Sequence, residues 1–296
     1  MASSTKPSLV TLGDFFRLAV RRFRAARLTY GHGTTNARDE AAFLVLEALR
    51  LPIHSLDPYL DLKLTVAERA RLLTLIDARV ALRLPAPYLV GAAYTHGVRF
   101  QVDKRALIPR SFIGDLLVGG ALPIGEPGRV RRVLDLCTGS GCLAILAALV
   151  FPHARIDAVD LSAGALALAR RNVATHRLQD RITLHRGDLF KPLASNRYDL
   201  ILSNPPYVDA GGMAKLPPEY RHEPRMALAA GDDGLDLVRR ILSDAPRHLA
   251  KNGSLLCEIG RGRKPLEAAY PRLPFLWLDT EQSTGEVFWI ARKDLV

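Results

Sequence analysis

Cysteine is scarce in this sequence of 296 residues, and long hydrophobic segments are missing from it. The three cysteines (Cys137, Cys142 and Cys257) form no Cys-x-x-Cys pair and no cluster with histidine, which argues against a disulfide framework and against a bound metal. The longest apolar run, Cys142–Phe151, is about half of the roughly 20 residues that a membrane span needs. Because the first residues also lack the layout of a signal peptide, we expect a cytoplasmic globular protein that makes no membrane contact.

Acidic residues are also in short supply. Asp and Glu number 30 against 41 Lys and Arg, which gives a formal net charge of +11. This balance favours acidic partners, of which nucleic acid and ribonucleoprotein are the obvious candidates. The arginine cluster Arg21–Arg27 (RRFRAAR) is the best candidate for such a contact surface, and a solvated helix face is the alternative interpretation.

The first 85 residues have the apolar spacing of helices. Helices are predicted over 11–23, 36–49 and 65–82, and each opens with a capping residue, namely Thr11, Asn36 or Thr65. Residues 1–85 are therefore predicted to form an N-terminal helical domain whose three helices bury a common face. The pattern changes at Pro85, and residues 86–129 predict a β-hairpin that turns at His96-Gly97, followed by a Pro/Gly-rich linker.

From residue 130 to residue 296, strands and helices alternate. The strands, such as RVLDLC and YDLILS, are almost continuously apolar. This alternation predicts an α/β domain with a mostly parallel sheet that is covered on both faces. In such sheets, ligands bind at the carboxyl ends of the strands.

Polar residues follow three of the predicted strands. Asp135 ends the first strand, and the turn after it contains Gly139 and Gly141, which allow a tight turn and a close approach of a ligand to the backbone. Asp160 ends the second strand, where a carboxylate can accept hydrogen bonds from both hydroxyls of a ribose, and Asp188 follows the third, where it can accept one from an adenine amino group. These residues predict a pocket for an adenosine-bearing ligand. A dinucleotide dehydrogenase fits the glycine turn and the spaced acid equally well, and a plain tight turn is the structural alternative.

Two consecutive prolines interrupt the fourth strand. Pro205 and Pro206 have no backbone N–H, so they cannot continue the ladder, and their fixed φ makes the turn rigid. The side-chain oxygen of Asn204 and the carbonyl of Pro205 can both accept hydrogen bonds from one planar NH2 group, on which Tyr207 can stack. Holding both hydrogens favours the positive charge that builds on the nitrogen as it attacks an electrophile. The order of this turn after the adenosine pocket favours methyl transfer from S-adenosylmethionine, with a plain turn as the alternative.

Several motifs carry a family resemblance. LDLCTGSGC, AVDLS, GDLF and LILSNPPYVD resemble the class I methyltransferases that modify amide or amino nitrogens. ALIPRS, NPPYVD and EYRHEPRMALAAGDDGLDLVRRIL narrow the resemblance to the protein-glutamine N5-methyltransferases, from Thr11 to the C-terminus. Within that family, Cys137 and the run SFIGDL after LIPR resemble the type that acts on the third protein of the large ribosomal subunit, rather than the type that acts on release factors.

The resemblance implies a Rossmann-like, mostly parallel seven-stranded sheet and methylation of a glutamine N5 with S-adenosylmethionine as cofactor. It implies that the substrate glutamine is held by Asn204, Pro205, Pro206 and Tyr207. The implied cofactor-binding residues are Asp135, Cys137, Thr138, Gly139, Ser140, Gly141, Asp160, Asp188, Leu189 and Asn204. The helical domain would recognise the ribosomal protein, free or in an assembly intermediate, and the basic surface would contact ribosomal RNA. Arg110 either assists this recognition or ties the hairpin to the sheet.

Two other interpretations stay open at this point. The Asn-Pro-Pro-Tyr turn suits a flipped adenine or guanine amine by the same hydrogen-bond logic, which describes a nucleic-acid methyltransferase. A ribosome-binding module without chemistry is the other. The lack of a separate target-reading module argues against the first, and the intact Asp160, Asp188 and Asn204–Tyr207 argue against the second.

Overall fold

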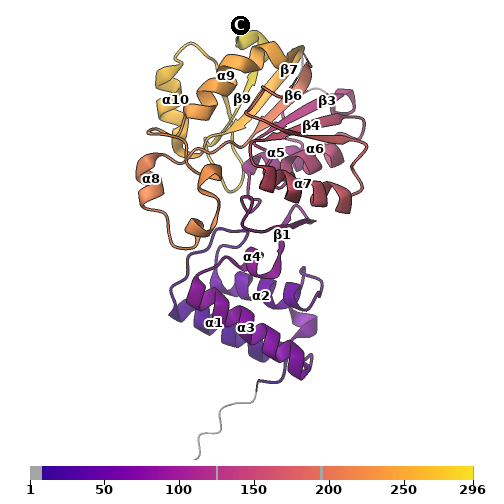
Figure 1. Cartoon of the computed structure of the whole chain (residues 1–296), viewed down its shortest axis with the longest axis vertical. Coiled ribbons are helices and arrows are strands. Elements are labelled where there is room, and N and C mark those ends of the chain that lie inside the picture. The colour runs from indigo at the N-terminus through magenta and orange to yellow at the C-terminus, as the bar shows by residue number, and fades with distance from the viewer. Residues whose placement is uncertain (1–8, 125, 194–195, 296) are drawn as a thin grey trace, which may run out of the picture. The chain divides into compact units, whose positions relative to one another are not determined.

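The computed structural model describes residues 9–124, 126–193 and 196–295, and its chain divides into two compact units (Figure 1). The helical unit comprises the chain up to Ala92 together with Pro217–His222. The sheet unit comprises Ala93–Leu216 and Glu223–Val296. The helical unit thus extends past the predicted boundary at residue 85 and takes in a segment from far downstream. Residues 1–8, 125, 194–195 and 296 of the predicted domains lie outside the described residues.

Helices account for most of the helical unit: α1 (Leu12–Ala25), α2 (Ala37–Ala48), α3 (Val66–Leu82) and α4 (Ala86–Val90), with 3₁₀ turns at Asp57–Tyr59 and Tyr220–His222. The predicted capping residues Thr11, Asn36 and Thr65 each accept a hydrogen bond from a backbone amide in the first turn of their helix. The stretch after Pro85, which we predicted to be extended, is instead the short helix α4. The fixed φ of Pro87 suits the first turn of a helix, where its missing N–H costs nothing.

The long helices bury a common apolar face, as their spacing predicted. Phe15 and Phe23 of α1 meet Leu44 of α2 and Ile76 of α3 in one cluster, and all four side chains are fully buried or nearly so. At about 25 cal/mol for each Å² of apolar area removed from water, this shared face is the main source of the unit's stability.

A buried ion network crosses the same unit. The Arg79 side chain is fully buried, and its Nε donates to Glu40 Oε1 at 2.7 Å while a terminal nitrogen donates to the Thr29 carbonyl at 3.1 Å. Glu219, also fully buried, accepts from the Thr29 amide at 3.0 Å and pairs with Arg83 at 2.8 Å. Burial raises the pKa of Glu40, although the charge of Arg79 opposes this shift. The network therefore holds the downstream segment in place, and it is costly to break.

The sheet unit is built on a mixed sheet that contains seven strands within the described ranges, in the order β5-β4-β3-β6-β7-β9-β8. The five strands β5, β4, β3, β6 and β7 run parallel to one another, whereas β9 is antiparallel to both β7 and β8. The predicted α/β class with a mostly parallel seven-stranded sheet is thereby confirmed. The strands are β3 (Arg132–Leu136), β4 (Arg155–Asp160), β5 (Ile182–Arg186), β6 (Tyr198–Ser203), β7 (Leu249–Glu258), β8 (Leu276–Leu278) and β9 (Val287–Ala291).

Helices cover both faces of this sheet (Figure 1). One face carries α5 (Phe112–Val118), α6 (Cys142–Val150) and α7 (Ala163–Thr175), and the other carries α9 (Asp236–His248) and α10 (Arg263–Ala269). The remaining short elements are α8 (Ala210–Ala214) and 3₁₀ turns at Pro127–Arg129, Arg225–Ala227, Gly260–Gly262 and Arg292–Asp294. Among the helices that the structure describes, none combines the length and the apolar character needed to cross a bilayer.

The predicted hairpin is present as β1 (Ala92–Thr95) and β2 (Val98–Gln101), with both residues of its His96-Gly97 turn at positive φ. The buried side chain of Asn172 on α7 accepts from the Gln101 amide at 2.8 Å and donates to the Gln101 carbonyl at 3.0 Å. It also donates to the Ser140 carbonyl at 2.9 Å. One amide group thus ties β2 and α7 to the turn that follows β3.

Replacing Arg79 with methionine is expected to lower the free energy of unfolding by about 3–5 kcal/mol, because it leaves the Glu40 carboxylate buried without its partner. The matched control is Arg17→Ala, which removes an exposed arginine paired with Asp14 and should change the free energy by no more than about 0.5 kcal/mol. Urea unfolding followed by far-ultraviolet circular dichroism measures both variants. Equal, small effects would contradict a structural role for the buried network.

Candidate functional site

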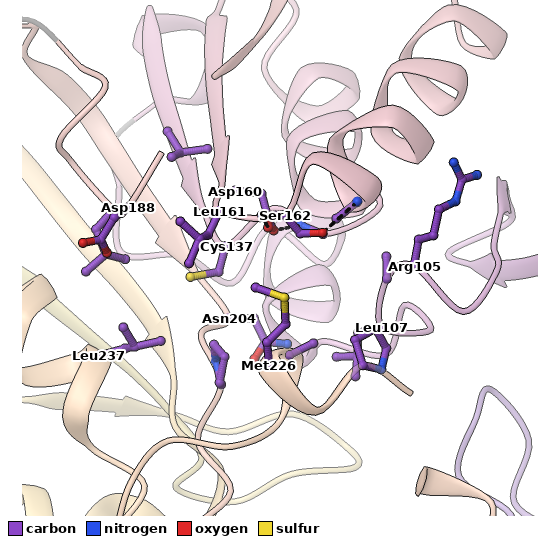
Figure 2. A pocket seen from close by; sticks show the side chains of 18 of the residues that line it. Arg105, Leu107, Cys137, Asp160, Leu161, Ser162, Asp188, Asn204, Met226 and Leu237 are labelled. Atoms are coloured by element: carbon purple, nitrogen blue, oxygen red, sulfur yellow. Dashed lines mark hydrogen bonds between the residues drawn. The ribbon is translucent and has the colours of Figure 1, made fainter. Parts of the chain in front are cut away.

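A cavity opens at the carboxyl ends of the central strands, where the residues after β3, β4, β5 and β6 come together (Figure 2). It is lined by residues from each of these strand ends, including Cys137, Asp160, Asp188 and Asn204. The parallel register of β4, β3 and β6 places these ends side by side, since Leu136 lies opposite both Val159 and Ser203. The cavity therefore occupies the position where ligands bind in open parallel sheets.

The turn after β3 is held open by unusual backbone conformations. Cys137, Gly139 and Gly141 all have positive φ, which glycine adopts freely and cysteine only at a cost of roughly 1–3 kcal/mol. A Cβ on Gly141 would lie 3.2 Å from the Ala169 Cβ of α7, whereas a Cβ on Gly139 would meet no atom within 4 Å. A side chain at Gly141 would thus crowd α7, and Gly139 exposes its backbone to the cavity.

Asp135 anchors this turn from below. Its carboxylate is fully buried, and one oxygen accepts from the Thr138 hydroxyl and from the Ala144 amide in the first turn of α6. Over the described residues, the other oxygen has no hydrogen-bond partner. Burial raises the pKa of Asp135 to about 7, with a smaller contribution from the charge of Asp160, while the two hydrogen bonds oppose the shift. Asp135 thus ties the turn to the start of α6.

Asp160 closes the turn from the end of β4. It accepts from the Gly139 amide at 2.9 Å and from the Ser162 amide at 2.8 Å, so its two oxygens hold the glycine turn and the start of α7. Burial raises the pKa of Asp160, and the backbone amides oppose this. An ionised carboxylate has about four acceptor positions, so Asp160 retains acceptor capacity toward the cavity that it lines.

Asp188 differs from Asp160 because it is already paired with cations. Lys191 and Arg240 each approach its carboxylate at 2.7 Å, and they lower the pKa of Asp188. Arg240 lies on α9, more than fifty positions along the chain, so sequence reasoning did not detect the pair. The cavity wall beside Asp188 is consequently a charged cluster and not a single acid.

The Asn204–Tyr207 turn follows β6 as predicted. Asn204 and Pro206 line the cavity (Figure 2), and, among the described residues, no group donates a hydrogen bond to the Asn204 side chain or to the Pro205 carbonyl. Both acceptors are thus free to receive hydrogens from a ligand. Tyr207 is placed differently, because it is absent from the cavity wall and its hydroxyl donates to Glu258 at 3.0 Å.

The cavity brings together seven of the residues predicted for the site: Cys137, Gly139, Asp160, Asp188, Leu189, Asn204 and Pro206. The other predicted residues, which are not part of its lining, support the two turns: Asp135, Thr138, Ser140, Gly141, Pro205 and Tyr207. Sequence reasoning missed a wall formed by Arg105–Leu107 and by Pro224, Met226 and Ala227, together with apolar residues at Leu161, Ala165 and Leu237. The motifs ALIPRS and EYRHEPRMALAA contain parts of these two segments, but the resemblance implied no contact with the cofactor for them. The residues described here include no group of three His, Cys, Asp or Glu side chains that could hold a metal ion.

Known proteins resemble this chain in family, in sequence and in fold. The model of the family "Methyltransferase small domain" matches residues 122–216. The chain is 57% identical to the ribosomal protein uL3 glutamine methyltransferase of Bradyrhizobium diazoefficiens and 53% identical to that of Bordetella pertussis; each alignment covers 100% of this chain, with 95% and 99% of the relative. Among solved structures, the hMettl16 catalytic domain in complex with MAT2A 3′UTR hairpin 1 is 18% identical, with a TM-score of 0.50 over 80% of this chain and 83% of that one. At that identity the likeness shows the fold alone.

The raised pKa of Asp135 predicts a pH dependence of stability. In the unfolded chain an aspartate loses its proton near pH 3.9, whereas folded Asp135 keeps it to about pH 7, so stability falls as the pH rises through this window and then levels off. Asp135→Asn cannot lose a proton and still accepts from Ala144. The free energy of unfolding of the wild type should therefore fall relative to that of the variant as the pH rises from about 4 to about 7. Urea titrations across that range measure it, and a constant difference would contradict the shifted pKa.

Proposed function

Since the chain belongs to the family of ribosomal protein uL3 glutamine methyltransferases, we propose that it transfers a methyl group from S-adenosylmethionine to the N5 nitrogen of a glutamine in uL3, the third protein of the large ribosomal subunit. The observation that carries the proposal is the shared cavity: Asn204 and Pro206 line it together with Asp160, and the Asn204 side chain and the neighbouring Pro205 carbonyl are free acceptors. The full-length identity to the relatives supports uL3 as the substrate in preference to a release factor.

The residues of the cavity fit S-adenosylmethionine. Asp160 has acceptor positions left for ribose hydroxyls, and Leu161, Leu189 and Leu237 provide an apolar wall for a flat ring. Gly139 presents backbone without a side chain at the turn where the amino-acid portion would lie. When bound, S-adenosylmethionine supplies an electrophilic methyl group on a positively charged sulfur.

The protein's own contribution to the reaction is made by the Asn204–Tyr207 turn. The Asn204 side-chain oxygen and the Pro205 carbonyl accept the two hydrogens of the glutamine NH2 group and hold its plane. This orients the nitrogen, and it stabilises the positive charge that develops there during attack. A strong base is not needed, because the nitrogen readily loses a proton once it carries the methyl group.

The helical unit supplies the surface for the protein substrate in this proposal. Its core and ion network are built from the unit's own residues, so its surface does not depend on the sheet unit for support. The site of action is the cytoplasm, where ribosomal proteins meet ribosomal RNA.

The same unit carries a basic surface, which we call the arginine groove: Arg17, Arg21 and Arg24 of α1 and Arg38 of α2, with Phe16 and Val20 at its base. All four arginines are exposed, and the Arg38 guanidinium stands over the Phe16 ring at 5.7 Å from its centre. Asp14 pairs with Arg17, while no carboxylate of the described chain pairs with Arg21 or Arg24. This charge is complementary to a phosphate backbone, and it supports contact with ribosomal RNA in an assembly intermediate.

The function is tested by offering purified uL3, release factor and RNA separately, with methyl-labelled S-adenosylmethionine. Label should enter uL3 and survive nuclease, and mass spectrometry should place one added methyl group on a glutamine. Label in RNA that nuclease releases would instead identify a nucleic-acid methyltransferase. Label in the release factor alone would show that the substrate is the release factor and not uL3.

Two substitutions should separate turnover from cofactor binding. Asn204→Ala removes one of the two acceptors and is expected to lower kcat by about 100-fold or more, with the affinity for S-adenosylmethionine nearly unchanged. Asp160→Ala should do the reverse and weaken cofactor binding about 10- to 100-fold, since it deletes charged hydrogen bonds. Calorimetry and single-turnover kinetics measure the two effects. If Asn204→Ala retained turnover, the assigned role of the turn would be wrong.

The arginine groove makes a separate prediction. Arg21→Glu combined with Arg24→Glu should weaken binding to a fragment of large-subunit ribosomal RNA and reduce the slope of log affinity against log salt by about 0.7–0.9 for each phosphate that is no longer neutralised. The control is Arg170→Glu with Arg171→Glu, an exposed pair on α7 that makes the same charge change. Methylation of free uL3 should be unaffected in both. Equal decreases of RNA affinity in the two variants would show that only net charge matters.

A further inference from the structure

We infer that Glu258 is a positioning residue: it holds the Tyr207 side chain and thereby fixes the Asn204–Tyr207 turn in its productive geometry. The inference rests on the proposed function, since it concerns the turn that would hold the substrate glutamine. Glu258 lies outside the sequence motifs described above, and it does not line the cavity.

Glu258 ends β7, the neighbour of β6 in the sheet. The last register pair between these strands is Ser203 with Cys257, so Glu258 and Asn204, the next residue of each, lie at the same level. The Glu258 side chain is about 1% exposed. A carboxylate in such a position persists only if it is well bonded.

Three donors satisfy this carboxylate. One oxygen accepts from the Tyr207 hydroxyl at 3.0 Å. The other accepts from the Ser111 hydroxyl at 2.6 Å and from the Phe112 amide at 2.9 Å. Burial raises the pKa of Glu258 to about 6, against these hydrogen bonds. The three donors come from the Asn204–Tyr207 turn and from the start of α5, so this one carboxyl group joins the two segments.

Tyr207 is confined by more than its hydroxyl. Gly260 has φ of +52°, and a Cβ there would lie 2.7 Å from a carbon of the Tyr207 ring. A Cβ on Gly234 would lie 2.4 Å from the Tyr207 carbonyl. The ring and the backbone of Tyr207 thus pack directly against glycine backbone on both sides, and the hydroxyl fixes the remaining rotation. Because Asn204 and Pro206 line the cavity while Tyr207 does not, Tyr207 acts on the site through the turn.

The Ser111 end of the arrangement connects to the cavity wall. Immediately before Ser111, the Arg110 guanidinium pairs with both oxygens of Glu223 at 2.6 and 2.8 Å, and the Ile108 amide donates to Glu223 at 3.1 Å. Leu107, which precedes Ile108, and Pro224, which follows Glu223, both line the cavity. Two buried carboxylates therefore hold the segment Ile108–Phe112: Glu223 next to the cavity wall and Glu258 next to the Asn204–Tyr207 turn. The two motifs ALIPRS and EYRHEP therefore meet here, through Arg110 and Glu223.

The test is a double-mutant cycle of Tyr207→Phe and Glu258→Gln. Each single variant should lower kcat for glutamine methylation by about 10- to 100-fold, because a displacement of the turn misplaces the nitrogen, and the double variant should lose no more than the worse single one. Calorimetry should give an unchanged affinity for S-adenosylmethionine. The matched control is Tyr198→Phe, which removes another tyrosine–carboxylate hydrogen bond, to Asp157 at 2.9 Å, from the opposite end of β6 and should leave kcat unchanged.

Losses that multiply in the double variant, or a weakening of cofactor binding in step with kcat, would overturn the inference. Amide hydrogen exchange provides a readout that does not need turnover. The amides of Tyr207 and Val208 should exchange faster in Glu258→Gln but not in Tyr198→Phe. The Val208 amide donates to the Leu228 carbonyl at 2.8 Å in the ordered turn. If the wild type fails to methylate uL3, the proposed function fails. The exchange rates still decide whether Glu258 orders the turn, and unchanged rates would refute it.

Discussion

The parallel register of β4, β3 and β6 is the constraint on which the site depends. Strands that run in one direction and pair in register must end at one edge, so the turn after β3, Asp160 and the Asn204–Tyr207 turn converge there, although they are separated by up to about seventy positions in the chain. The two consecutive prolines terminate β6 at that edge and leave acceptors unpaired. A shift in register of one residue would turn these side chains to the other face of the sheet.

Buried carboxylates fix the loops around this edge. Asp135 accepts from the Ala144 amide, Glu223 from the Ile108 amide and Glu258 from the Phe112 amide. In the helical unit, Glu219 accepts from the Thr29 amide in the same way. In each case a carboxyl group from one segment satisfies a backbone donor of another, so loops and the first turns of helices gain the fixed geometry that regular strands obtain from their ladders. The low exposure of these carboxyl groups makes any alternative position costly, because it would leave buried polar atoms without partners.

The parts of the fold that could be predicted from the sequence are those that local physics decides. Caps at Thr11, Asn36 and Thr65, apolar strands, the glycine turn and the double proline are each recognisable within a few residues, and the structure contains all of them. The omissions come from distant partners. The contact of Arg240 with Asp188 and of Glu223 with Arg110 joins residues that are 52 and 113 positions apart, and no local pattern encodes such a pair. The apolar wall at Leu107 and Met226 was not predicted for the same reason. An apolar side chain in a loop has no local sequence pattern that indicates whether it lines a cavity.

The assignment of Pro217–His222 to the helical unit has a consequence for how the chain acquires its structure during synthesis. Arg79 and Arg83 are made early, but the carboxylate of Glu219 that pairs with Arg83 and approaches Arg79 emerges only after most of the central strands. A nascent chain halted before that point would hold the buried Arg79 against Glu40 alone, and Arg83 without its carboxylate partner. The amino-terminal helices can thus reach their final packing only late in translation, and a gene fragment that encodes them alone would lack part of its own interior.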